Sequence, residues 1–202
     1  MKKPFILIML AITFIIGACS NETGGPIGKN QLPIMKLAGS FSINVENINE
    51  IVGDADYVFV ANVNSEIETI YKNPVVIETK YGPKEVSDPY TKYSITIIDN
   101  IKGKLKKNTE LEILKRGGIT QDRKSIVLYE HDQLLEVGKL YIIAAYAQPD
   151  GSLLISGPNS SIVLPVTNNN EIASSSEYKK YKKAFENEIK TDRERFKSSY
   201  ED

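Results

Sequence analysis

The 202-residue chain contains one cysteine, one histidine and no tryptophan. A single thiol cannot form a disulfide within the chain, so we expect a fold that is held together by its core alone. One histidine provides little material for a metal site or for a serine–histidine dyad, and no G-x-S-x-G motif is present. We therefore predict no catalytic residues, no metal and no cofactor.

The N-terminus has the organisation of a secretory signal. Lys2 and Lys3 form a positively charged start, residues 4–16 are mostly apolar, and the small residues Gly17 and Ala18 follow. A membrane-spanning helix needs roughly 20 apolar residues, and this run is shorter. A retained anchor helix is therefore the least favoured interpretation of residues 1–18.

The four residues Ile16-Gly17-Ala18-Cys19 resemble the lipobox of bacterial lipoproteins, with isoleucine where that family more often has leucine. The resemblance implies cleavage between Ala18 and Cys19 and a diacylglyceryl thioether on Cys19, with N-acylation of Cys19 as a further option. Two acyl chains hold a protein stably on a bilayer. The protein would then be anchored on the extracytoplasmic face of the cell membrane. The alternative is an ordinary secreted protein that is cut after Ala18.

The charge balance argues against one class of partner. Removing Lys2 and Lys3 with the signal reduces the 25 basic residues to 23 against 26 acidic ones, a formal charge of −3. A nearly neutral chain has no overall attraction for nucleic acid, which we exclude as a partner. The expected partners are the membrane, through lipid on Cys19, and an envelope protein, peptide or wall polymer.

The chain after the signal divides into three parts. Residues 19–42 are rich in Gly, Pro and Asn and predict a flexible, lipid-anchored tether. Residues 43–170 predict a β domain, and residues 171–202 predict a charged, amphipathic C-terminal helix. A few apolar residues of the tether are candidates for docking on the domain: Ile34, Met35, Leu37 and Phe41.

Within residues 43–170, short apolar runs alternate with turn residues, as in antiparallel sheets. A short helix is expected at residues 43–52, ended by Gly53-Asp54, and a buried strand at residues 57–63. We expect this strand to continue to a turn at Asn73-Pro74 and to return through residues 75–81. The further predicted strands are residues 90–101, 111–114, 125–130, 140–147, 153–156 and 161–166.

Seven or eight short strands without disulfides predict a small antiparallel barrel or a sandwich. The succession of a long first strand, a hairpin and later strands that close back resembles OB-type and netrin-like barrels. This resemblance rests on strand order alone, so it implies a fold and not a function.

Residues 174–200 lack Gly and Pro and are dense in Lys and Glu, which predicts a helix. Its start can be capped by Ser174 to Ser176. The apolar face of this helix could pack on the domain or bind a partner, and the sequence supports both alternatives. That face would carry Tyr178, Tyr181, Phe185, Ile189 and Phe196.

The only candidate metal site is His131 with its neighbours Glu130 and Asp132 and the preceding Asp122, because imidazole and carboxylate suit zinc. Adjacent residues of an extended chain point to opposite sides, so a solvent-exposed loop histidine is the preferred interpretation. We predict a non-catalytic binding or interaction module with no assigned ligand. The alternative is a small surface-anchored hydrolase or metal-dependent enzyme.

Overall fold

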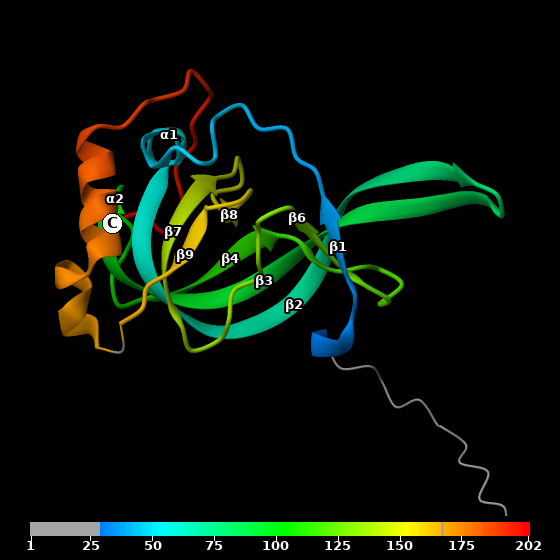
Figure 1. Cartoon of the computed structure of the whole chain (residues 1–202), viewed down its shortest axis with the longest axis horizontal. Coiled ribbons are helices and arrows are strands. Elements are labelled where there is room, and N and C mark those ends of the chain that lie inside the picture. The colour runs from blue at the N-terminus through cyan, green and yellow to red at the C-terminus, as the bar shows by residue number, and fades with distance from the viewer. Residues whose placement is uncertain (1–28, 167) are drawn as a thin grey trace, which may run out of the picture.

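The computed structural model describes residues 29–166 and 168–202 (Figure 1). The fold is mainly β with a C-terminal helix, as predicted. Its helices are η1 (Lys29–Gln31), α1 (Ile48–Asp54), η2 (Asn169–Ser174) and α2 (Ser176–Glu186). Its strands are β1 (Ile34–Leu37), β2 (Tyr57–Thr79), β3 (Gly82–Lys102), β4 (Glu110–Arg116), β5 (Gly118–Ile119), β6 (Ile126–Tyr129), β7 (Leu140–Ala147), β8 (Leu153–Ile155) and β9 (Ser161–Val163).

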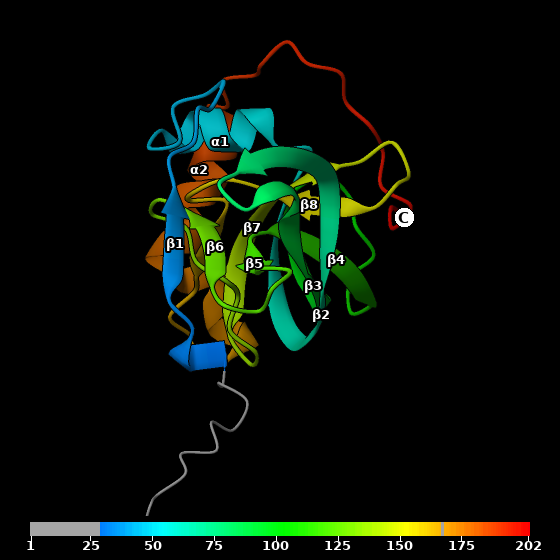
Figure 2. The same cartoon turned by 90° about the vertical axis from the view of Figure 1, so that its right-hand side faces the viewer.

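Five strands form a nearly closed ring. They are hydrogen-bonded in the order β2-β3-β4-β8-β7, and β7 pairs back with β2. Every pairing around the ring is antiparallel except that of β4 with β8. A second, smaller sheet has the order β1-β6-β5, and β1 runs parallel to β6. Figure 2 views the molecule from the side on which β1 and β6 lie.

The alternation of side chains along the strands explains the two main cores. Tyr57, Phe59 and Ala61 of β2 point into the ring, where they pack with inward residues of the other strands. Val58 and Val60 point outward and are covered by α1 and α2. Strand β7 and the first residues of β2, 57–61, are therefore buried on both faces, which accounts for their nearly continuous apolar sequence.

The first hairpin differs from the prediction. Strand β2 passes straight through Asn73-Pro74, where the register with β3 shifts between Lys72 and Val75 and Asn73 has a φ of 54°. Such a bulge accommodates a proline, which cannot donate a ladder hydrogen bond. The chain turns only at Lys80-Tyr81, before Gly82. Residues 72–88 consequently form a two-stranded ribbon, hereafter the ribbon, that projects from the ring (Figure 1).

The C-terminal helix α2 ends at Glu186. It is therefore shorter than the helix predicted for residues 171–202. Ser175 caps its start, and Tyr178 and Tyr181 are buried against the domain, so the helix packs on the domain. Residues 187–202, hereafter the strap, are extended. Their backbone groups bond to distant segments, for example Ile189 N to Asn49 O at 3.0 Å, and Phe196 and Tyr200 pack against the ring core. These tertiary contacts override the helical propensity of the sequence.

The segment predicted as a tether is folded from Lys29 onward. Leu32 is buried, and Phe41 packs edge-on against Tyr129 with ring centroids 5.2 Å apart. Strand β1 joins the small sheet, so residues 29–42 are part of the folded unit and not a flexible tether. The predicted signal, its cleavage site at Ala18 and Cys19, and tether residues 19–28 lie outside the described residues.

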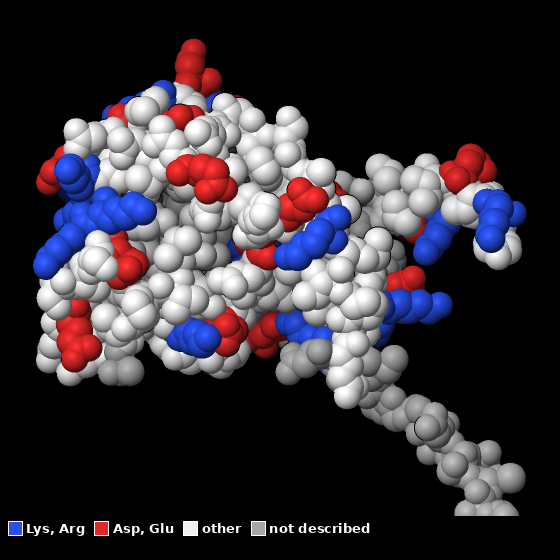
Figure 3. Space-filling view, viewed as in Figure 1, with Lys and Arg blue, Asp and Glu red and all other residues white. Residues whose placement is uncertain are grey.

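No helix of the described residues is long and apolar enough to cross a membrane. Acidic and basic side chains are interspersed over the face of the molecule shown in Figure 3.

Candidate functional site

Polar groups from several elements converge at the end of the ring where β7 begins. Leu111, Ile113 and Lys115 are the inward residues of β4, and Lys115 is fully buried. Lys115 Nζ lies 2.8 Å from Asp132 Oδ1 and 3.3 Å from Ser161 Oγ. Asp132 belongs to the loop between β6 and β7, so this ion pair fastens that loop to the ring.

The environment of the pair favours a positioning role. Burial lowers the pKa of Lys115, and the carboxylate of Asp132 opposes that effect. A lysine beside a serine could in principle act as a base, but Lys115 and Ser161 are both buried and the lysine is held by a carboxylate. The geometry therefore suits the positioning of the loop better than it suits chemistry at Ser161.

Two buried polar atoms near this end of the ring have no hydrogen-bond partner among the described residues: Asp132 Oδ2 and the Tyr93 hydroxyl. Burial raises the pKa of Tyr93, and the negative charge of Glu66 raises it further. A buried polar group without a partner costs about 1–3 kcal/mol, and most such groups in proteins are satisfied. Each of these atoms could therefore accept a hydrogen bond from a ligand or from water.

A groove of about 820 Å³ lies beside Asp132, between the η1–β1 segment and the loop that carries this residue. Asp132 forms part of its wall, and Lys36 Nζ donates to the Asp132 carbonyl oxygen at 2.8 Å. Lys29, also in the wall, forms an ion pair with Glu66. The apolar lining consists of Leu32, Ile34, Ile126, Leu128, Leu134, Leu135 and Val137.

Within residues 29–166 and 168–202, strand β1 is an edge of the small sheet. The carbonyl oxygens of Pro33 and Leu37 accept hydrogen bonds from β6 and the residue after it. The backbone groups of the alternate residues, Ile34 and Lys36, therefore point away from β6. The side chains of Ile34 and Met35 are 56% and 52% exposed. An edge of this kind can pair with another extended chain.

The residues singled out as a metal candidate are not brought together. His131 is exposed in a turn with a φ of 61°, and Glu130 and Asp122 are also exposed. Asp132 alone turns inward. No three His, Cys, Asp or Glu side chains of residues 29–166 and 168–202 are placed to hold a metal ion. Sequence reasoning missed Lys115, although its position in the inward phase of Leu111 and Ile113 was a usable signal.

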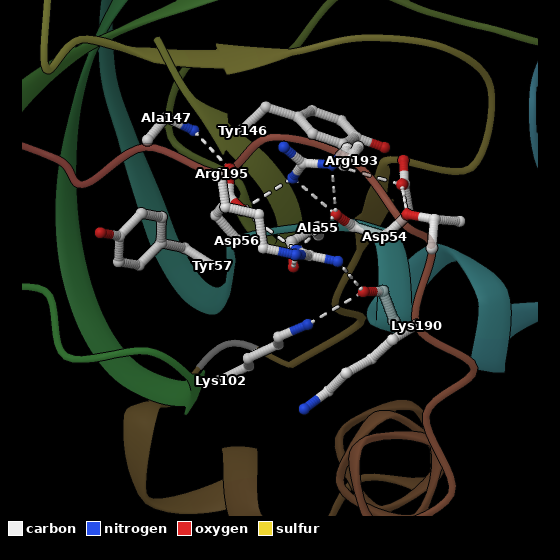
Figure 4. A network of polar contacts seen from close by, with 12 residues as sticks. Asp54, Ala55, Asp56, Tyr57, Lys102, Tyr146, Ala147, Lys190, Arg193 and Arg195 are labelled. Carbon is white, nitrogen blue, oxygen red and sulfur yellow. Dashed lines mark hydrogen bonds and ion pairs between the residues drawn. The ribbon is translucent and has the colours of Figure 1, made fainter. Parts of the chain in front are cut away.

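A second polar network lies at the opposite end of the ring, where the strap meets α1 (Figure 4). Arg193 Nη2 and Arg195 Nη1 lie 2.7 and 3.1 Å from Asp56 Oδ1. Both arginines also donate to the carbonyl oxygen of Asp54, and Lys102 donates to that of Val52. Cations stabilise the carbonyl-bearing end of a helix, so this network fastens the strap to α1.

No protein-family model matches the chain, and no curated protein matches it.

Proposed function

We propose that the protein is a lipid-anchored, non-catalytic binding module on the extracytoplasmic face of the cell membrane, and that it captures an extended segment of an envelope protein at the free edge of β1. The ring is proposed to be an OB-type barrel. Its chain order, with the third and fifth ring strands adjacent and parallel, supports this assignment. Fold likeness says nothing about the ligand, which is argued from the site alone.

The observation that carries the proposal is the edge of β1, unpaired among the described residues, beside a groove whose wall includes Asp132, the residue whose buried Oδ2 has no partner there. An extended peptide could pair its backbone with the outward groups of Ile34 and Lys36 and place a side chain in the groove. A donor on that side chain would satisfy Asp132 Oδ2. A glycan lacks the repeating N–H and C=O groups that pair with a strand edge, so a polypeptide is the favoured ligand.

A proline at position 36 tests the edge. Lys36→Pro removes the outward N–H, and edge strands tolerate proline. Lys36→Ala is the matched control, because it removes the same side chain and keeps the N–H. Peptides selected from a displayed random library on the wild-type protein should bind Lys36→Ala within a few-fold of wild type. They should bind Lys36→Pro roughly tenfold more weakly or worse, since losing backbone pairing costs about 1.4 kcal/mol or more. Equal binding by the two variants would contradict pairing at this edge.

The anchor has its own test. Cys19→Ala removes the proposed acceptor of the lipid, so the variant should be misprocessed or released from the membrane fraction, whereas wild-type protein stays with it. The measurement is fractionation of cells followed by mass spectrometry of the mature N-terminus. A wild-type mature chain that carries no lipid would refute the anchor.

A further inference from the structure

The ribbon exposes large apolar side chains. Ile77, Val76 and Tyr81 are 43%, 66% and 88% exposed. Among the residues that the structure describes, the two strands of residues 72–88 pair only with each other. An isolated two-stranded hairpin is at best marginally stable in water, and clustered exposed apolar residues mark interaction surfaces.

The two faces of the ribbon differ in charge. Residues that pair directly across an antiparallel ladder share a face, so Val75 lies beside Val86 and Ile77 beside Lys84. Lys72 pairs with Asp88, which lies two residues beyond Val86 on β3 and therefore on the same face. Lys72 thus belongs to this face as well. We name this apolar surface with flanking lysines the lysine face.

Two ion pairs border the lysine face. Asp88 pairs with Lys72 across the ladder and belongs to the lysine face, where its carboxylate lies 3.2 Å from Arg116 at the base of the ribbon. Lys84 Nζ lies 3.7 Å from Asp122 Oδ2, and both of these side chains are largely exposed. An exposed pair is worth only about 0–1 kcal/mol, so Lys84 can exchange this partner for another anion.

The opposite face is acidic. Val76 pairs with Glu85, and Glu78 pairs with Pro83. A ribbon lying flat with the lysine face downward would turn Glu78 and Glu85 toward water.

The chain leading to Lys29 limits where this surface can be. Ten residue steps separate Cys19 from Lys29, and even a fully extended chain of that length spans only about 35 Å. A lipid on Cys19 would therefore hold the folded unit close to the bilayer. Segment η1 and the ribbon lie on the same side of the molecule, away from α2 (Figure 1).

We propose that the lysine face of the ribbon is a second membrane contact, which lies on the lipid headgroups of the membrane to which Cys19 is anchored. This inference rests on the lipid anchor of the proposed function. Lysines keep their stems on apolar surface while their charged ends reach headgroups, and tyrosine favours the same interface. Each lysine near an anionic surface contributes about 1 kcal/mol. A membrane explains the exposed Val75 and Ile77, the lysines beside them and the two glutamates of the outer face together.

The absence of tryptophan from the sequence allows a sharp test. Ile77→Trp places a single fluorophore on the lysine face, and Val76→Trp places one on the adjacent, opposite face. Both positions are exposed, so neither variant should disturb the core. The full lipidated chains are reconstituted in vesicles of equal parts phosphatidylcholine and phosphatidylglycerol, with phosphatidylcholine brominated on its acyl chains as the quencher.

We expect the brominated lipid to quench the fluorescence of the Ile77→Trp variant several-fold more than that of the Val76→Trp variant. A second change, Lys72→Glu with Lys84→Glu in the Ile77→Trp chain, should reduce that quenching. Equal quenching of the two variants, or no quenching of Ile77→Trp, would overturn the inference. An unquenched Ile77→Trp variant that self-associates in sedimentation would assign the ribbon to a second copy of the chain, which also overturns it.

Mass spectrometry of the same samples separates the two proposals. Lipid on Cys19 together with an unquenched Ile77→Trp variant refutes only the ribbon contact. A chain without lipid refutes the anchor.

Discussion

Replacing Asp132 with alanine is expected to lower the free energy of unfolding by about 3–5 kcal/mol, the usual cost of leaving one charge of a buried pair without its partner. Lys115 is fully buried, and Asp132, 2.8 Å away, is its only ion-pair partner among the described residues. The measurement is urea unfolding followed by far-ultraviolet circular dichroism.

The double variant Lys115→Met with Asp132→Leu is the matched control, because it removes both charges and keeps apolar bulk. Buried pairs replaced in this way are often neutral or more stable, so the double variant should unfold close to wild type or above it. A double variant as unstable as Asp132→Ala would show that the loss comes from packing.

The Lys115–Asp132 pair also predicts how the stability of the Asp132→Ala variant depends on pH. Burial lowers the pKa of Lys115 below its ordinary value of 10.5, and Asp132→Ala removes the group that opposes this shift. Between the folded and unfolded pKa values, the unfolded chain binds a proton that the folded chain does not. The stability of Asp132→Ala should therefore recover as the pH rises toward 10.5.

Gly53→Ala is expected to destabilise the protein by about 1–3 kcal/mol, the cost of overpacking, although alanine ordinarily stabilises a helix by about 1 kcal/mol relative to glycine. Gly53 belongs to α1, and an added Cβ would lie 2.8 Å from Ile189 N and nearer still to its carbonyl group. The strap backbone would have to move away.

Urea unfolding measures the loss, and trypsin cleavage at Arg193 and Arg195 reports release of the strap. Asn49→Ala in the same helix is the control, since it raises helix propensity and its side chain makes no hydrogen bond among the described residues. A stabilised Gly53→Ala protein would contradict the close approach of the strap.

The sequence predicted the ring strands well because their signal is local. Alternation along residues 57–63 and the apolar run of residues 140–147 indicate buried strands whatever their partners are. The predicted turn at Asn73-Pro74 was wrong because a bulge uses the same residues as a turn. The length of α2 was wrong because contacts of the strap with α1 and the ring outweigh local propensity.

The candidate site was harder to predict, because its parts are far apart in the sequence. Asp132 stood out in the sequence only as a neighbour of His131. Its ion-pair partner is Lys115, an inward residue of β4 that lies 17 residues earlier. The edge role of β1 depends on parallel pairing with β6, 92 residues later, and composition alone could not show it.

The strap also has a consequence for the order in which the chain folds. Arg193 bonds to the carbonyl oxygen of Asp54, 139 residues earlier in the chain. Contacts of such long sequence separation are slow to form, because a large loop must close before they stabilise anything. During synthesis from the N-terminus, the start of β2 appears long before the residues that cover it. The final docking step must therefore wait for the last residues of the chain, and until then the ring remains open at one end.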